Sequence, residues 1–102
     1  VIMVENWKEL YSELIKYLEG NLSEKVKKEA FFEIIFMTYS FVHVKINEEA
    51  FPNAIQLYQK EQMTGRGKGK YMYKNELRKD GEIFIREQMK KYFPFSKIEY
   101  IV

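Results

Sequence analysis

The chain has 102 residues, of which 46% are hydrophobic and 31% are charged, the balance of an ordinary globular protein. It contains no cysteine, which excludes disulfides, zinc ribbons and thiol nucleophiles from these residues. The formal net charge is only +2, but seven basic side chains lie between residues 60 and 79. Such an uneven distribution is typical of proteins with an anionic partner.

Residues 6–19 predict an amphipathic helix. Asn6 is a suitable N-cap, and Glu9 stands three residues later, as in a capping box. Gly20 is placed to end the helix in a left-handed conformation. The start of the chain lacks the basic and long apolar regions of a signal peptide, so a cytoplasmic protein is expected. The apolar residues recur at helical spacing, and they are Trp7, Leu10, Tyr11, Leu14, Ile15 and Leu18.

Residues 23–47 form a long apolar stretch that is expected to lie in the core. The absence of Gly and Pro favours one long helix from Ser23 to Asn47, capped by the Ser23 hydroxyl. The alternative is a helix beginning at Ser23 and a strand from about Tyr39, because β-branched and aromatic residues crowd this part. Too few uncharged residues follow one another here for a membrane span. In the long helix the less apolar positions share one face: Glu29, Glu33, Ser40, His43 and Asn47.

Residues 47–63 predict a helix of about 12 residues that is capped by Asn47 or Asn53 and ends before Gly65. Residues 64–70, TGRGKGK, predict a flexible loop, because three glycines alternate with basic residues. The alternation of Tyr71 and Tyr73 with their neighbours is typical of a short strand. The apolar face of the helix would carry Phe51, Ala54, Ile55 and Tyr58.

Residues 79–82 resemble a turn, and two continuations are open. One is a hairpin whose return strand covers residues 82–86. The other, which we favour, is a helix capped by Asp80 that stops at Pro94, because residues 86–93 are good helix formers. Residues 97–102 alternate as a strand and are expected to pair with residues 70–74. The favoured helix would bury Phe84, Ile85, Met89, Tyr92 and Phe93.

Together these elements predict an α+β fold. Residues 1–102 are expected to form one small, predominantly helical domain with three to four helices and a short sheet of two or three strands.

The basic glycine loop is the strongest functional candidate. It matches neither the G-x-G-x-x-G dinucleotide loop nor the phosphate-binding P-loop. Basic side chains neutralise phosphates, however, and tyrosine rings stack on bases. We therefore expect a small nucleic-acid-binding module whose contact residues are Arg66, Lys68, Lys70, Tyr71, Tyr73, Lys74, Arg78 and Lys79.

The order of a glycine-rich basic loop, a tyrosine-containing strand, Leu77, Gly81 and a helix resembles the wing and following helix of winged-helix regulators. The likeness covers about 30 residues, from Gly65 to Phe93. It implies that basic residues of the wing contact the DNA backbone. No short helix-turn-helix with a tight glycine turn precedes Gly65.

No residue pattern indicates catalysis, a metal site or a cofactor, so a non-enzymatic protein is expected. A lone histidine such as His43 is usually a hydrogen-bonded structural residue. The alternative function is a protein-interaction module, such as a toxin inhibitor or a phage or plasmid accessory protein. A small ribonuclease using His43 and a glutamate is a more distant alternative. Exposure of Trp7 or of the Phe31–Phe32 pair would provide a homodimer face.

Overall fold

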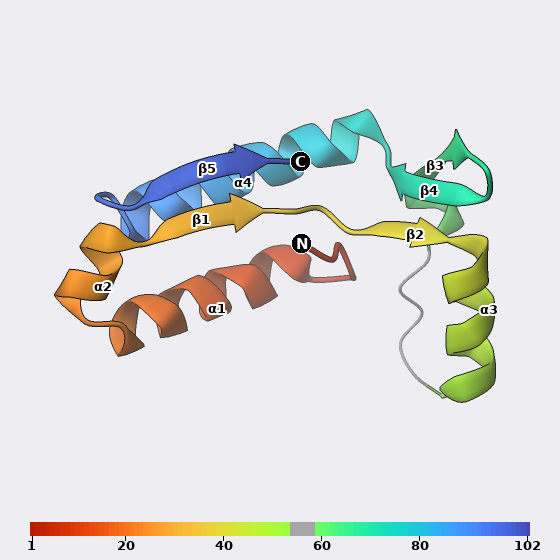
Figure 1. Cartoon of the computed structure of the whole chain (residues 1–102), viewed down its shortest axis with the longest axis horizontal. Coiled ribbons are helices and arrows are strands. Elements are labelled where there is room, and N and C mark those ends of the chain that lie inside the picture. The colour runs from red at the N-terminus through yellow and green to blue at the C-terminus, as the bar shows by residue number, and fades with distance from the viewer. Residues whose placement is uncertain (54–58) are drawn as a thin grey trace.

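The computed structural model describes residues 1–53 and 59–102. In these residues the chain forms four α-helices, a short 3-10 helix and five strands, arranged in a body of 43 × 27 × 21 Å (Figure 1). The predicted α+β fold is confirmed. In chain order the elements are α1 (Trp7–Asn21), α2 (Glu24–Glu29), β1 (Phe31–Ile34), β2 (Thr38–Ser40), α3 (Phe41–Ala50), η1 (Lys60–Gln62), β3 (Met63–Gly67), β4 (Lys70–Tyr73), α4 (Asn75–Tyr92) and β5 (Lys97–Ile101).

β1 and β5 lie side by side as a parallel pair, with Phe32 opposite Ile98 and Ile34 opposite Ile101. Figure 1 shows α1 and α4 running alongside this pair. Side chains from both helices meet inward-facing strand residues such as Phe32 in one apolar cluster. This cluster covers one face of the pair, and its most buried members are Ile15, Ile85, Met89 and Phe93.

The other strands form an antiparallel sheet in the order β2–β4–β3. A second apolar cluster lies against it, made by Met3, Phe36, Tyr39, Met63 and Tyr73. The hydroxyl of Tyr73 accepts a hydrogen bond from the backbone N–H of Met3 at 2.8 Å, in a buried position. The start of the chain is thereby fixed to β4.

The prediction of one helix from Ser23 to Asn47 is wrong. Ser23 does cap a helix, since its hydroxyl accepts a hydrogen bond from Val26, but α2 ends at Glu29 and Ala30 is extended. The following residues pair with strands that lie far along the chain, β1 with β5 and β2 with β4. The hydroxyl of Ser40 then caps α3 by accepting from the N–H of His43. A serine therefore caps the start of α2 and of α3. The chain leaves the helical conformation between these two helices without a glycine.

The helix predicted after Asn47 is also wrong in its start, because Asn47 lies inside α3 and Pro52–Asn53 form a turn. Its proposed apolar face falls largely on residues 54–58, which lie outside the described residues. The loop predicted at residues 64–70 is instead most of a β-hairpin made by β3 and β4. Lys68 and Gly69 turn the chain with φ of 54° and 71°, the left-handed values that a tight hairpin requires.

The helix predicted from Asp80 exists but starts earlier, at Asn75, and the alternative hairpin is wrong. Asp80 and Gly81 lie within α4, and Phe84 and Tyr92 are only partly buried. The strand at residues 97–102 is confirmed, but it pairs with β1 and not with residues 70–74.

The first helix is confirmed with small differences at its ends. The side chain of Asn6 makes no capping hydrogen bond, and Asn6 itself has a left-handed φ of 58°. Gly20 does not end the helix, which continues to Asn21.

Candidate functional site

The predicted contact residues gather around the hairpin and the first turns of α4. Arg66, Lys68 and Lys70 are exposed on the hairpin, and Lys74 is the N-cap residue of α4. In residues 1–53 and 59–102, the ion pairs involve other cations, namely Lys8, Lys27, Arg86 and Lys97. The positive charge of the hairpin and the start of α4 is therefore not neutralised by side-chain carboxylates of the described chain.

Tyr73 is a correction to the predicted contact residues. Its side chain is only 1% exposed, and its hydroxyl is occupied by the Met3 N–H. Burial raises the pKa of Tyr73 above its usual range, and the hydrogen bond from Met3 opposes this shift. A ring in this position cannot stack on a base, so Tyr73 is a core residue. Tyr71, by contrast, is partly buried, and it lies opposite Tyr39 and Gly65 in the sheet.

A cavity of about 560 Å³ lies where the antiparallel sheet, the end of β5 and α4 meet. Arg66 of β3 and Arg78 of α4 both line it. The rest of the wall is mainly apolar and includes Phe36 and Met72. A smaller hollow of about 210 Å³ adjoins Arg78 and is also lined by Lys79. The structure thus brings Arg66 and Arg78 to one cavity, and Arg78 and Lys79 to the adjoining hollow.

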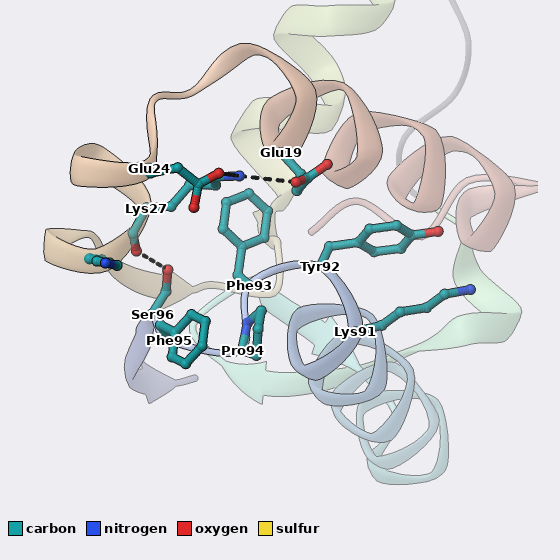
Figure 2. A pocket seen from close by; sticks show the side chains of 10 residues that line it. Glu19, Glu24, Lys27, Lys91, Tyr92, Phe93, Pro94, Phe95 and Ser96 are labelled. Carbon is teal, nitrogen blue, oxygen red and sulfur yellow. Dashed lines mark hydrogen bonds and ion pairs between the residues drawn. The ribbon is translucent and has the colours of Figure 1, made fainter.

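A different pocket, of about 260 Å³, lies at the ends of α1 and α4 (Figure 2). Here Lys27 Nζ lies 3.0 Å from Glu19 Oε1 and 2.7 Å from Glu24 Oε1. The hydrogen bond and ion pair with Lys27 lower the pKa of Glu24, and those with Glu24 and Glu19 raise the pKa of Lys27. The hydroxyl of Ser96 donates to the backbone oxygen of Lys27. These contacts join α2 to α1 and to the segment before β5, which is a structural role.

The candidate residues for ribonuclease chemistry are not brought together. His43 is exposed on α3, and its ring lies edge-on to Tyr39 with the centroids 6.0 Å apart. Within the described residues, no group of three or more His, Asp or Glu side chains could hold a metal ion. A search of the same residues finds no helix with the length and apolar character needed to cross a membrane.

The aromatic residues suggested as a homodimer face divide between the core and the surface. Trp7 packs edge-on against Phe84 at 5.3 Å, and Phe32 packs against Phe93 at 5.0 Å. Phe31 is 69% exposed. The homodimer stays a prediction.

Comparison with known proteins identifies the family. The family model of spore photoproduct lyase matches residues 1–102. The chain belongs to this family. The spore photoproduct lyase of Bacillus subtilis (strain 168) is 30% identical to it over 104 residues, which cover 94% of this chain and 29% of the relative.

Solved structures of spore photoproduct lyase share the fold. One, complexed with dinucleoside spore photoproduct, has a TM-score of 0.86 and 24% identity, and the match covers 99% of this chain and 31% of that one. Another, a mutant with bound AdoMet and dinucleoside spore photoproduct, has a TM-score of 0.85 over 98% of this chain and 31% of its own. The chain therefore spans about three tenths of the length of these relatives.

The family corrects the functional predictions. The expected non-enzymatic nucleic-acid-binding module and the alternative interaction module are both wrong, because the matching family is that of a lyase. The winged-helix resemblance covered only part of the chain, whereas the family model covers all of it. The 102 residues contain no thiol, and the described residues contain no group of three or more His, Asp or Glu side chains that could hold a metal ion.

Proposed function

We propose that this chain works as one part of a spore photoproduct lyase. The observation that carries the proposal is the match of the family model to all 102 residues, together with 30% identity to the Bacillus subtilis enzyme. The chain spans 29% of that relative, so the activity of a whole lyase requires further residues. A cytoplasmic location, expected from the sequence, stays a prediction.

The exposed apolar surface of the chain supports a role within a larger enzyme. Parallel strands normally have both faces covered, yet α1 and α4 cover only one face of the β1–β5 pair. On the other face Phe31 and Ile35 are exposed, beside Glu33. The protruding helix α3 also exposes Phe41 and Val42 (Figure 1). Exposed apolar surface of this kind marks contacts with other protein segments, here the remaining part of the lyase.

The chemistry of its side chains supports a binding role for this part of the enzyme. Its unneutralised cations are suited to phosphates, which attract basic side chains through charge and counterion release. We assign the nucleic-acid contact to Tyr71 and to the cations Arg66, Lys68, Lys70, Lys74, Arg78 and Lys79.

A chimeric enzyme tests the proposal. The segment of the Bacillus subtilis lyase that matches this chain is replaced by the chain itself, and cleavage of a spore photoproduct within an oligonucleotide is measured with AdoMet present. We expect activity within about tenfold of the parent enzyme, which corresponds to a change of about 1.4 kcal/mol in the activation free energy. The matched control is the same enzyme with the segment deleted, which should be inactive. A folded, soluble chimera without activity would overturn the proposal.

A further inference from the structure

A β-bulge in the parallel pair turns Tyr100 to the face that no helix covers. Ile98 and Tyr100 lie opposite successive residues of β1, so Glu99 between them has no partner on that strand. Such a bulge leaves one residue unpaired and redirects the side chains that follow it. Ile98 and Ile101, which would lie on opposite faces of a regular strand, are both partly buried, whereas Tyr100 is 41% exposed.

On the uncovered face Tyr100 lies opposite Glu33 of β1. The Tyr100 hydroxyl donates a hydrogen bond to the Glu33 carboxylate, and this bond raises the pKa of Tyr100. In the described part of the chain, no cation forms an ion pair with Glu33. Lys97, on the same strand as Tyr100, is paired with Glu99 at 3.6 Å. The charge of Glu33 is therefore not neutralised by another side chain of the described residues.

Apolar side chains surround this polar pair. Phe31 is 69% exposed, and Ile35 and Val102 are each 52% exposed. Both faces of parallel strands are normally covered, and the matching segment is only 29% of the length of the Bacillus subtilis lyase. The cover that the apolar side chains require is therefore expected from the rest of the lyase polypeptide.

The cover must also satisfy Glu33. A carboxylate has several acceptor sites, and the Tyr100 hydroxyl supplies one proton. Removing the charged group from water without a positive partner would cost several kcal/mol. The segment that lies on this face therefore has to bring a positive charge to the carboxylate.

We propose that the remaining part of the lyase docks on this face of β1 and β5 and brings a lysine or arginine side chain to the Glu33–Tyr100 pair. Phe31 and Ile35 supply the apolar contact around that ion pair. The inference rests on the proposed function and deepens it, because it names the docking surface and the chemistry of the partner side chain.

The test compares melting temperatures of the isolated chain and of the chimeric lyase. Glu33→Gln keeps a hydrogen-bonding side chain but removes its charge. It should lower the melting temperature of the chimera by about 5 °C or more, because the loss of one partner of a buried ion pair is strongly destabilising. In the isolated chain, where Glu33 is exposed, the shift should be less than about 2 °C. Tyr100→Phe should also lower the melting temperature more in the chimera than in the isolated chain.

Glu87→Gln is the matched control, because Glu87 is an exposed carboxylate of α4. It should shift the melting temperature by less than about 2 °C in both proteins. Equal shifts for Glu33→Gln in the two proteins would overturn the inference. So would a Glu87→Gln shift in the chimera as large as that of Glu33→Gln.

Hydroxyl-radical footprinting, read by mass spectrometry, measures the cover itself. Phe31 and Tyr100 should be oxidised in the isolated chain and should lose most of this oxidation in the chimera without substrate. Equal oxidation in both proteins would overturn the inference. Protection that appears only after dinucleoside spore photoproduct is added would assign the face to the substrate instead. Protection in the isolated chain that grows with its concentration would assign the face to a second copy.

The proposed function is tested separately, by cleavage with the unsubstituted chimera. An active chimera whose melting temperature and footprint contradict the expectations would refute only the docking surface. An inactive chimera would refute the proposed function, and its melting temperature would still report whether this face is covered.

Discussion

Gly81 of α4 lies directly against the ring of Phe36. A Cβ atom built on Gly81 would lie 2.5 Å from Cε1 of Phe36 and 2.6 Å from Cε of Met3. Gly81 is buried, and both neighbours belong to the apolar cluster beside the antiparallel sheet. The missing side chain therefore lets α4 approach Phe36, in the segment between β1 and β2, and Met3, which precedes α1. Gly81 also lies one turn beyond Arg78. The contact between Gly81 and Phe36 therefore positions Phe36 in the wall of the cavity that Arg66 and Arg78 line.

Substitution of Gly81 by alanine should destabilise the chain. Alanine is better than glycine in a helix by about 1 kcal/mol, but an extra methyl group in a packed core costs about 1–3 kcal/mol. The Met3 side chain has a flexible end that can move, whereas the Phe36 ring is enclosed. We expect Gly81→Ala to lower the free energy of unfolding by about 1 kcal/mol, measured by urea denaturation.

Gly20→Ala is the control for this prediction. Gly20 lies in the last turn of α1, and a Cβ there would have no heavy atom within 4 Å. Only the helix propensity should change, so Gly20→Ala should be neutral or stabilising by up to about 1 kcal/mol. If both alanine variants were equally stabilising, the close approach at Gly81 would have no energetic importance.

Removal of the Tyr73 hydroxyl should destabilise the chain at neutral pH. The Tyr73→Phe variant keeps the ring in the core but leaves the buried N–H of Met3 without its acceptor. An unsatisfied buried donor costs about 1–3 kcal/mol. Tyr17→Phe, at a position 65% exposed, should change the free energy of unfolding by less than about 0.5 kcal/mol. Equal stability of Tyr73→Phe and the parent in urea denaturation would contradict this role.

The same tyrosine predicts a dependence of stability on alkaline pH. Burial raises the pKa of Tyr73 above the usual 10.0. Below pH 10 the phenol is protonated in both folded and unfolded chains, so its contribution to stability is fully present there. Above pH 10 the unfolded chain releases this proton first, and the contribution is lost as the pH rises through the folded pKa. The stability gap between the parent and Tyr73→Phe should therefore stay constant below pH 10 and narrow as the pH rises above 10. A gap that stays constant above pH 10 would contradict the raised pKa.

The fold was predictable from sequence where its determinants are local. The helical period of α1 and the alternation of β5 both indicated the observed elements. The central stretch was misjudged because β1 pairs with a strand more than 60 residues later, and a pairing partner at that distance leaves no local signal. Ser40 did carry a signal, since a serine followed by a helical run is a typical N-cap. Ser40, a second potential N-cap inside the predicted long helix, indicated that this helix is not continuous.

The sequence predicted which cations belong to the candidate site, but not how the fold arranges them in space. Arg66 and Arg78 share a cavity only because a bulge interrupts β3 and because α4 starts at Asn75. Neither feature follows from composition or spacing. Tyr71 and Tyr73 share one face of β4, and sequence alone does not show that this face lies against the core. The sequence did not indicate a lyase because its 102 residues contain no thiol. The described residues also contain no group of His, Asp or Glu side chains that could hold a metal ion.

The cap at Ser40 should control the order of α3. Ser40→Ala removes the acceptor of the His43 N–H and should cost about 0.5–2 kcal/mol. The helix exposes much of its apolar surface, including Phe41, Val42 and Ile46, so little packing compensates for the lost cap. Hydrogen exchange of α3 amides should accelerate more than that of α4 amides. Ser23→Ala, which removes the cap of α2, is the control, and it should leave α3 exchange unchanged. Equal acceleration in α3 and α4 would show that the loss is global.

Two residues on the apolar face of α1 should differ widely in their energetic importance. Ile15 is 7% exposed and belongs to the cluster with Ile85 and Met89, whereas Leu10 is 45% exposed. Ile15→Ala should lower the free energy of unfolding by about 2–4 kcal/mol, because it removes buried methyl groups and leaves a cavity. Leu10→Ala should cost less than about 1 kcal/mol in the isolated chain, since water already reaches the side chain. The chimeric lyase tests whether Leu10 contacts the rest of the enzyme. If it does, Leu10→Ala should lower the melting temperature of the chimera more than that of the isolated chain. An equal effect of Leu10→Ala in both settings would show that this face of α1 stays exposed to solvent.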